Sequence, residues 1–246
     1  MEEKISEGKI DYSQSNNKII NWFRNYWYYY KWIVIGIAFA LVVIIFCTVQ
    51  TCSSTSADIT LLYAGPFPSA HSGVPDMRNA FEAVLPEDFN ENGEKDVSIA
   101  MLMIYSAEQM DALEKNPSEN VQNVDRYQNS TEYQKFQSLI VSGEYYVCLL
   151  DEWLFEELNK ENLFLPLADA IGYKPENAAN DYAIKLSDTE FGKYYNAMQL
   201  LPADTYLCIR APGVVQEMTG KGAQSKRFEQ AAAMIKAIID FKAPED

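Results

Sequence analysis

The hydrophobic positions of this chain form one long continuous run followed by a series of shorter ones. The long run, Trp32 to Val49, holds eighteen residues and no charged side chain. As a helix rising about 1.5 Å per residue it reaches roughly 27 Å, close to the hydrocarbon thickness of a bilayer. The pattern predicts a transmembrane helix over 32–49, with a tail over 1–31 before it. A linker over 50–57 and a globular domain over 58–246 follow.

Within that domain, short apolar runs alternate with stretches of helical spacing. The runs predict four strands, over 58–65, 97–105, 145–151 and 205–212. Apolar residues three and four apart predict the intervening helices, among them one that Gly143 ends and an Ala-rich one over 225–242. Buried strands separated by helices predict an α/β domain of three layers, with a mainly parallel sheet covered on both faces.

The flanks of the long run predict its orientation. Lys18, Arg24 and Lys31 precede it, whereas the next basic residue after it is Arg78. Basic residues close to a spanning helix are retained in the cytoplasm, so we expect the tail inside and the domain outside. The Trp and Tyr residues from Trp22 to Trp32 suit an interfacial aromatic belt. We therefore expect a single-pass protein of the cell membrane that contacts the lipid bilayer through Trp32 to Val49.

The long run has two other interpretations, a cleaved signal peptide and a lipidated anchor. A cleaved signal peptide would use Thr55-Ser56-Ala57 as its cleavage site, but the thirty-one-residue lead and the long apolar core favour an uncleaved anchor. Lipidation would use Cys52, but Val49-Gln50-Thr51 lacks the small residue that usually precedes a lipidated cysteine. The uncleaved anchor remains the interpretation that the sequence favours.

Charge narrows the range of partners. Of the 20 Lys and Arg residues five lie at or before Lys31, and of the 35 Asp and Glu residues four do, which leaves the rest of the chain with a formal charge of −16. Such a surface repels nucleic acid and anionic lipid headgroups, so no nucleic-acid partner is expected.

Cys148 and Cys208 both lie in predicted strands. They could be buried thiols, or a disulfide if they are adjacent in space. Buried thiols are favoured because a domain of this size needs no cross-link.

The ends of the predicted strands hold the candidate ligand-binding residues. In open α/β sheets, ligands bind beyond the carboxyl ends of the strands. The candidates at those ends are Ser69, His71, Ser72, Tyr105, Ser106, Asp151, Trp153 and Arg210. Lining one cleft, they would offer a stacking face at Trp153 and a fork of donors at Arg210, although Trp153 is equally compatible with a core position.

One segment resembles a calcium-binding loop. The front half of a calcium loop is formed by Asp88, Asn90, Asn92 and Asp96, with Gly93 at the turn. Its twelfth position is Ile99 instead of a bidentate Glu, so we expect a polar turn without a metal.

Nucleophilic catalysis would rest on Ser69, His71 and Ser72, with Asp151 orienting the base. These Ser and His residues are neighbours in a Pro-rich loop, and no GxSxG elbow exists. The sequence therefore predicts neither catalysis nor a bound cofactor.

Three segments carry a family resemblance: DITLLYAG, DFNENGEKDVSIAML and LIVSGEYYVCLLDEWLFEELNKENLFLPLADAI. They resemble the first lobe of the extracellular solute-binding proteins of ABC importers. The resemblance implies a periplasmic-binding-like fold, a ligand cleft and a Gram-positive source, but a second lobe is missing and a spanning helix replaces the lipid anchor.

We therefore expect a membrane-anchored, extracytoplasmic binding or envelope-interaction module that is not an enzyme. Its partner would be a small molecule or a protein of the envelope. A substrate-binding component of an ABC importer and a membrane-anchored hydrolase are the two alternatives.

Overall fold

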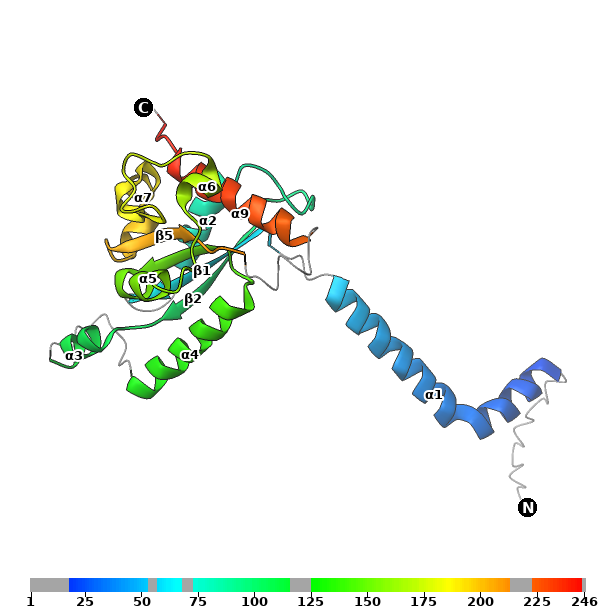
Figure 1. Ribbon diagram of the computed structural model, residues 1–246. Helices are drawn as coiled ribbons and strands as arrows, with labels where there is room; N and C mark the ends of the chain where they lie inside the picture. Colours follow the sequence, from blue (N-terminus) through cyan, green and yellow to red (C-terminus); the bar gives the residue numbers. More distant parts are fainter. Residues whose placement is uncertain (1–17, 53–56, 68–72, 116–124, 213–222, 245–246) are drawn as a thin grey trace, which may run out of the picture. The chain divides into compact units, whose positions relative to one another are not determined.

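The computed structural model describes residues 18–52, 57–67, 73–115, 125–212 and 223–244 (Figure 1). The chain divides into two compact units, Met1–Thr55 and Ser56–Asp246. The boundary between them falls inside the predicted linker.

The first unit contains the helix α1, Lys18–Cys52, which is 35 residues long. By length and composition its segment Tyr26–Phe46 is able to cross a membrane, and none of that segment is buried within the protein. Trp32 is 76 % exposed and Phe39 is 70 % exposed, so the surface of this helix consists of large apolar side chains. Such a helix suits a hydrocarbon environment. The segment begins six residues before the predicted run and includes part of the aromatic belt.

The second unit is built on a five-stranded sheet in the order β2-β1-β3-β5-β4. The strands are β1 Ile59–Gly65, β2 Val97–Met103, β3 Val147–Asp151, β4 Ala183–Lys185 and β5 Thr205–Ile209. β1 runs parallel to β2 and to β3, whereas β5 runs antiparallel to β3 and to β4.

The predicted α/β class is confirmed, but the sheet is mixed and not mainly parallel. β5 is buried along its whole length, like the parallel strand β3, so its apolar run lacks the polar alternation that often marks an antiparallel strand. β4 was not predicted because three residues are too few to show a period.

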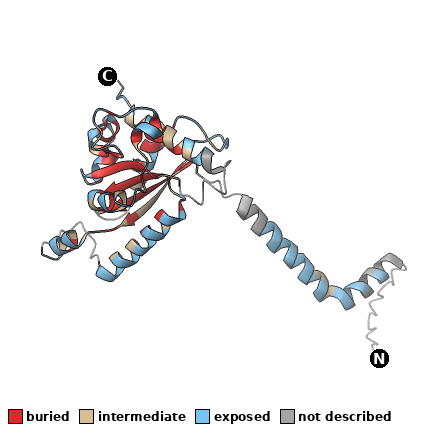
Figure 2. Ribbon diagram, viewed as in Figure 1, coloured by how far each residue is buried: buried red, intermediate tan, exposed pale blue. Residues whose placement is uncertain are grey.

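Helices cover both faces of this sheet, as Figures 1 and 2 show. On one face α2, α6, α7 and α9 pack against side chains such as Leu61 and Tyr63 of β1. On the other face α4 and α5 pack against Leu62 and Ala64 of the same strand. The helices are α2 Val74–Val84, α3 Ala107–Lys115, α4 Arg126–Ser142, α5 Glu152–Asn159, α6 Leu167–Ile171, α7 Glu190–Tyr194 and α9 Ala223–Ile239, with 3₁₀ turns at η1 Leu186–Asp188 and η2 Asn196–Leu200.

The boundaries of α4 follow from local capping. The Asp125 side chain accepts a 3.0 Å hydrogen bond from the Tyr127 N–H at the start of the helix. Gly143, at a left-handed φ of 72°, ends it as predicted. Phe136 and Ile140 are the buried residues of this helix, and they hold it on the sheet. The start of α4 is thereby fixed at the carboxyl end of β2, where the candidate site lies.

Candidate functional site

The structure brings some of the predicted site residues together and separates others. Tyr105 and Ser106 follow β2, Asp151 ends β3, and Trp153 lies in the first turn of α5. All four lie at the carboxyl ends of parallel strands, at one edge of the sheet. Ser69, His71 and Ser72 lie outside the described residues.

Arg210 lies at the opposite edge from that group. Because β5 runs antiparallel, its carboxyl end meets the amino end of β3, where the Arg210 N–H donates to the Tyr146 carbonyl across 2.8 Å. Arg210 is 5 % exposed, and burial lowers the pKa of its guanidinium. The single cleft expected from the sequence is therefore not formed with Arg210.

A cavity of about 470 Å³, the carboxyl-edge cavity, lies between the end of β2 and the helices α3, α4 and α5. Three of the predicted residues, Tyr105, Ser106 and Trp153, line it. Its other lining residues are Ile104, Ala107, Glu108, Met110, Arg126, Asn129, Ser130, Tyr133 and Glu157. Asp151 does not line it but is joined to its wall through Gln109.

Two stacked rings form one wall of this cavity. The centroids of Tyr133 on α4 and Trp153 on α5 lie 6.0 Å apart, with an interplanar angle of 23°. The Tyr133 hydroxyl donates a 2.9 Å hydrogen bond to Glu157. Burial of the phenol, and to a smaller extent the nearby Glu157 carboxylate, raises the pKa of Tyr133. The Trp153 Nε1 atom is buried and has no hydrogen-bond partner among the described residues. The wall therefore offers an aromatic surface.

Side-chain amides hold the end of β2 in place. The Asn129 side chain pairs with both backbone groups of Tyr105, accepting from its N–H and donating to its carbonyl, each at 2.9 Å. Ser106 and Gln109 cap α3 reciprocally, each side chain accepting from the other residue's N–H. Gln109 then donates from Nε2 to Asp151 at 3.0 Å.

Sequence reasoning missed both amide residues. The spacing Ser106-Ala-Glu-Gln109 is a capping-box signal and could have indicated Gln109. Asn129 carries no such signal, because its partner Tyr105 lies 24 residues away. Only the packing of α4 against β2 brings these two residues together.

The charges around the carboxyl-edge cavity are mostly negative. Arg126, the one basic residue among the described residues that line it, makes ion pairs with Asp111 at 2.7 Å and Glu114 at 2.9 Å. Glu108 and Glu157 supply carboxylates directly to the wall. The Arg126 charge is thus already compensated by its own two acids.

Asp151, the last residue of β3, lies close to the end of β1. It is 5 % exposed, and burial raises the pKa of its carboxyl although the Gln109 amide donates to it. A Cβ on Gly65 would lie 2.9 Å from the Asp151 Cβ, so the absence of a side chain at Gly65 permits the two strand ends to approach.

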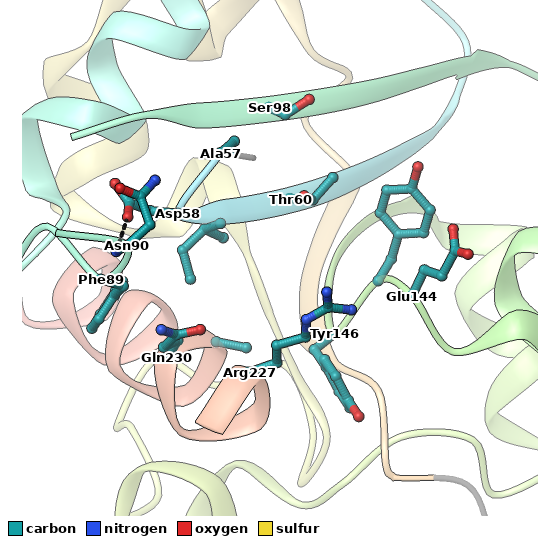
Figure 3. Close-up of a pocket in the computed structure, with 13 residues that line it drawn as sticks. Ala57, Asp58, Thr60, Phe89, Asn90, Ser98, Glu144, Tyr146, Arg227 and Gln230 are labelled. Atoms are coloured by element: carbon teal, nitrogen blue, oxygen red, sulfur yellow. Dashed lines mark hydrogen bonds between the residues drawn. The ribbon is translucent and has the colours of Figure 1, made fainter. Parts of the chain in front are cut away.

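A second cavity of about 470 Å³, the amino-edge cavity, lies at the other edge of the sheet (Figure 3). Figure 3 shows Arg227 and Gln230 reaching from α9 and Glu144 from the turn before β3. The Asp58 carboxylate in its wall accepts from the N–H of Asn90 at 2.7 Å and of Asp96 at 2.9 Å. That carboxylate thus holds the 88–96 loop against the start of β1.

The calcium-like loop uses its oxygens within the turn. Asp88 accepts from the Gly93 N–H at 2.7 Å, and the Asn92 side-chain amide donates to Asp96 at 3.3 Å. Backbone donors including the Gly93 N–H lower the pKa of the Asp88 carboxyl, outweighing its desolvation. Across the part of the chain that the structure describes, no group of three or more His, Cys, Asp or Glu side chains is placed to hold a metal ion.

Comparison with known proteins gives no match: no family model, no curated protein and no solved structure matches this chain.

Proposed function

We propose that this protein is a membrane-anchored, non-catalytic binding domain whose ligand occupies the carboxyl-edge cavity. The observation that carries the proposal is the convergence on one cavity of Tyr105 and Ser106, which follow β2, and of Trp153 in α5, beside the Tyr133 ring of α4. A concave site with aromatic walls and a few convergent polar groups is typical of small-molecule binding.

The anchor and its orientation complete the proposal. Helix α1 would hold the domain at the membrane, and the basic residues before the apolar segment favour an extracytoplasmic domain. The resemblance to solute-binding proteins favours the same location and the same kind of ligand. In this arrangement the domain meets its ligand at the outer surface of the cell membrane.

Protease accessibility in intact cells tests the location. Full-length protein carrying one epitope tag at each end is treated with an external protease. We expect loss of the C-terminal tag and protection of the N-terminal tag, with the protein resisting carbonate extraction of the membranes. A protected C-terminal tag, or release of the domain from the membrane as a cleaved product, would contradict the anchored extracytoplasmic domain.

Ligand binding is tested with Trp153 as the reporter. The other tryptophans of the chain, Trp22, Trp27 and Trp32, all lie in α1, so replacing these three by Phe leaves Trp153 alone. The single-tryptophan protein in detergent is screened with sugars, short peptides, amines and organic acids by fluorescence and thermal shift. We expect at least one class to change both signals saturably. If none does, the small-molecule function is wrong.

A further inference from the structure

We propose that the carboxyl-edge cavity binds an organic cation, a primary amine or a quaternary ammonium group, between the Trp153–Tyr133 wall and the carboxylates of Glu108 and Glu157. This inference rests on the proposed function and adds the chemical class of the ligand. It follows from the combination of rings and charges in the wall, and not from any one of them.

The rings provide the first part of the recognition. The indole and phenol faces attract a cation through their quadrupoles, and the effect is larger when the cation is partly desolvated. Tyr133 and Trp153 are both partly buried, lie 6.0 Å apart and line the same cavity. A cation placed against this wall would therefore exchange part of its hydration for aromatic contacts.

The carboxylates provide the second part. Glu108 and Glu157 line the cavity from different helices, α3 and α5. Each accepts a hydrogen bond, from the Ser106 hydroxyl at 3.0 Å and the Tyr133 hydroxyl at 2.9 Å, which fixes its direction. A carboxylate has about four lone-pair positions, so both retain capacity for a ligand N–H or for a cation in close contact.

Three helix N-termini near this cavity would favour an anion. Their partial positive charges have to be set against the acidic side chains beside them. α3, α4 and α5 all begin near this edge, and each N-terminus carries a partial charge of roughly +0.5. Acids already complement all three: Glu108 in the first turn of α3, Asp125 at the cap of α4 and Glu152 in the first turn of α5. With Arg126 compensated by Asp111 and Glu114, negative charge predominates at the site.

The charge of the whole domain acts in the same direction. The chain beyond Lys31 carries a formal charge of −16, which raises the local concentration of cations and lowers that of anions. Because the site is partly open to solvent, this contribution is screened by salt. A cationic ligand should therefore bind more weakly as the ionic strength rises.

The test uses the full-length single-tryptophan protein in detergent and four probes: putrescine and tetramethylammonium as cations, glucose as a neutral polyol and citrate as an anion. We expect saturable changes in Trp153 fluorescence and in the melting temperature with the two cations, weaker at high salt. Glu157→Gln and Glu108→Gln should each lower the affinity by about 3- to 10-fold. Tyr133→Leu should lower it similarly through the lost ring face.

Two control variants separate the site from the general charge of the domain. Glu87→Gln removes one exposed acid that lines neither cavity, and Arg227→Ala changes the amino-edge cavity. Neither should alter cation affinity by more than about 2-fold. The melting temperature of each variant without probe shows whether it is folded.

The outcomes are distinguishable. Cation binding that is lowered by Glu157→Gln and Glu108→Gln but not by the controls supports the proposal. The proposal of an organic cation is overturned if all variants bind the cations equally. It is also overturned if Trp153 responds to citrate or glucose and not to the cations. In both cases the proposed binding function is retained. Failure of all four probes also overturns the cation, whereas the binding function fails only if the wider screen is negative as well.

Discussion

Cys148 of β3 and Cys208 of β5 lie directly opposite each other in antiparallel register, and the Cys208 thiol donates toward the Cys148 carbonyl across 3.6 Å. Both side chains are completely buried and both are free thiols, so the sequence-based prediction of buried thiols is confirmed. Burial raises the pKa of Cys148 to about 12 and that of Cys208 well above its usual range. The pair thus belongs to the core that joins the parallel and antiparallel parts of the sheet.

These two thiols should not react in the folded protein. A thiol with a pKa near 12 is only about one part in ten thousand thiolate at pH 8, and the thiolate is the reactive form. In a Cys47→Ser, Cys52→Ser background, mass spectrometry after iodoacetamide treatment should show no modification of the native protein at pH 8. Two adducts should form once urea unfolds it. Rapid labelling of the native protein, or a mass two units low that a reductant restores, would contradict this expectation.

Asp58 should contribute strongly to stability although it lies at the edge of the sheet. Its carboxylate accepts from two backbone N–H groups, those of Asn90 and Asp96, and the residue is 9 % exposed. Hydrogen bonds to a charged acceptor are stronger than neutral ones, so Asp58→Ala should lower the free energy of unfolding by about 2–3 kcal/mol. Urea denaturation measures the change.

The control residue for this prediction is Glu94, which lies in the 88–96 loop that Asp58 holds. Glu94 is exposed, and Glu94→Ala should change the free energy of unfolding by no more than about 0.5 kcal/mol. Equal effects of Asp58→Ala and Glu94→Ala would show that the Asp58 carboxylate does not hold the loop.

Gly192 in α7 should tolerate no side chain. A Cβ there would lie 2.0 Å from the Leu186 carbonyl oxygen, a backbone atom that cannot move alone. The Gly192 N–H also donates to the Thr189 hydroxyl at 2.9 Å, which fixes the turn. Gly192→Ala should therefore cost about 3 kcal/mol through overpacking.

The neighbouring residue provides the comparison for Gly192. Lys193 is exposed, and Lys193→Ala should change the melting temperature little because no buried contact is lost. A Gly192→Ala protein that unfolds at the wild-type temperature would be incompatible with the position of Leu186.

Asp151 should make stability depend on pH. Burial raises the pKa of its carboxyl above the ordinary value of 3.8, so the folded state holds the proton more tightly than the unfolded chain. The stability that this residue contributes therefore falls as the pH rises from 3.8 through the raised pKa. Asp151→Asn removes the titration and can still accept from Gln109.

The free energy of unfolding of Asp151→Asn, relative to wild type, should accordingly increase between pH 4 and pH 7. Denaturation curves at several pH values measure this difference, and Glu87→Gln controls for the loss of one negative charge. A difference that decreases with rising pH would mean that the native site favours the charged carboxylate.

Local patterns predicted much of the domain. Strand segments at β1, β2, β3 and β5 and the end of α4 at Gly143 are found where the sequence placed them. Tyr105, Ser106 and Trp153 were predicted as site residues, and the structure places them around one cavity, while their role in binding stays a prediction. These successes share a cause: burial along one strand or one helix turn is visible in a short window.

Long-range relationships were not predictable in the same way. The direction of β5, the three-residue strand β4 and the pairing of Asn129 with Tyr105 all depend on residues far apart in the chain. Arg210 was separated from the other candidates by the direction of β5 alone.

By itself the sequence determined the apolar N-terminal helix, the acidic character of the domain, its α/β class and the position of most strands. Each of these depends on composition or on a period that neighbouring residues share. Only the tertiary structure decided which strands run antiparallel, which strand ends meet and which rings stack. The reason is physical: a strand covered on both faces carries the same apolar pattern in either direction, so its neighbours, and not its own residues, select its orientation.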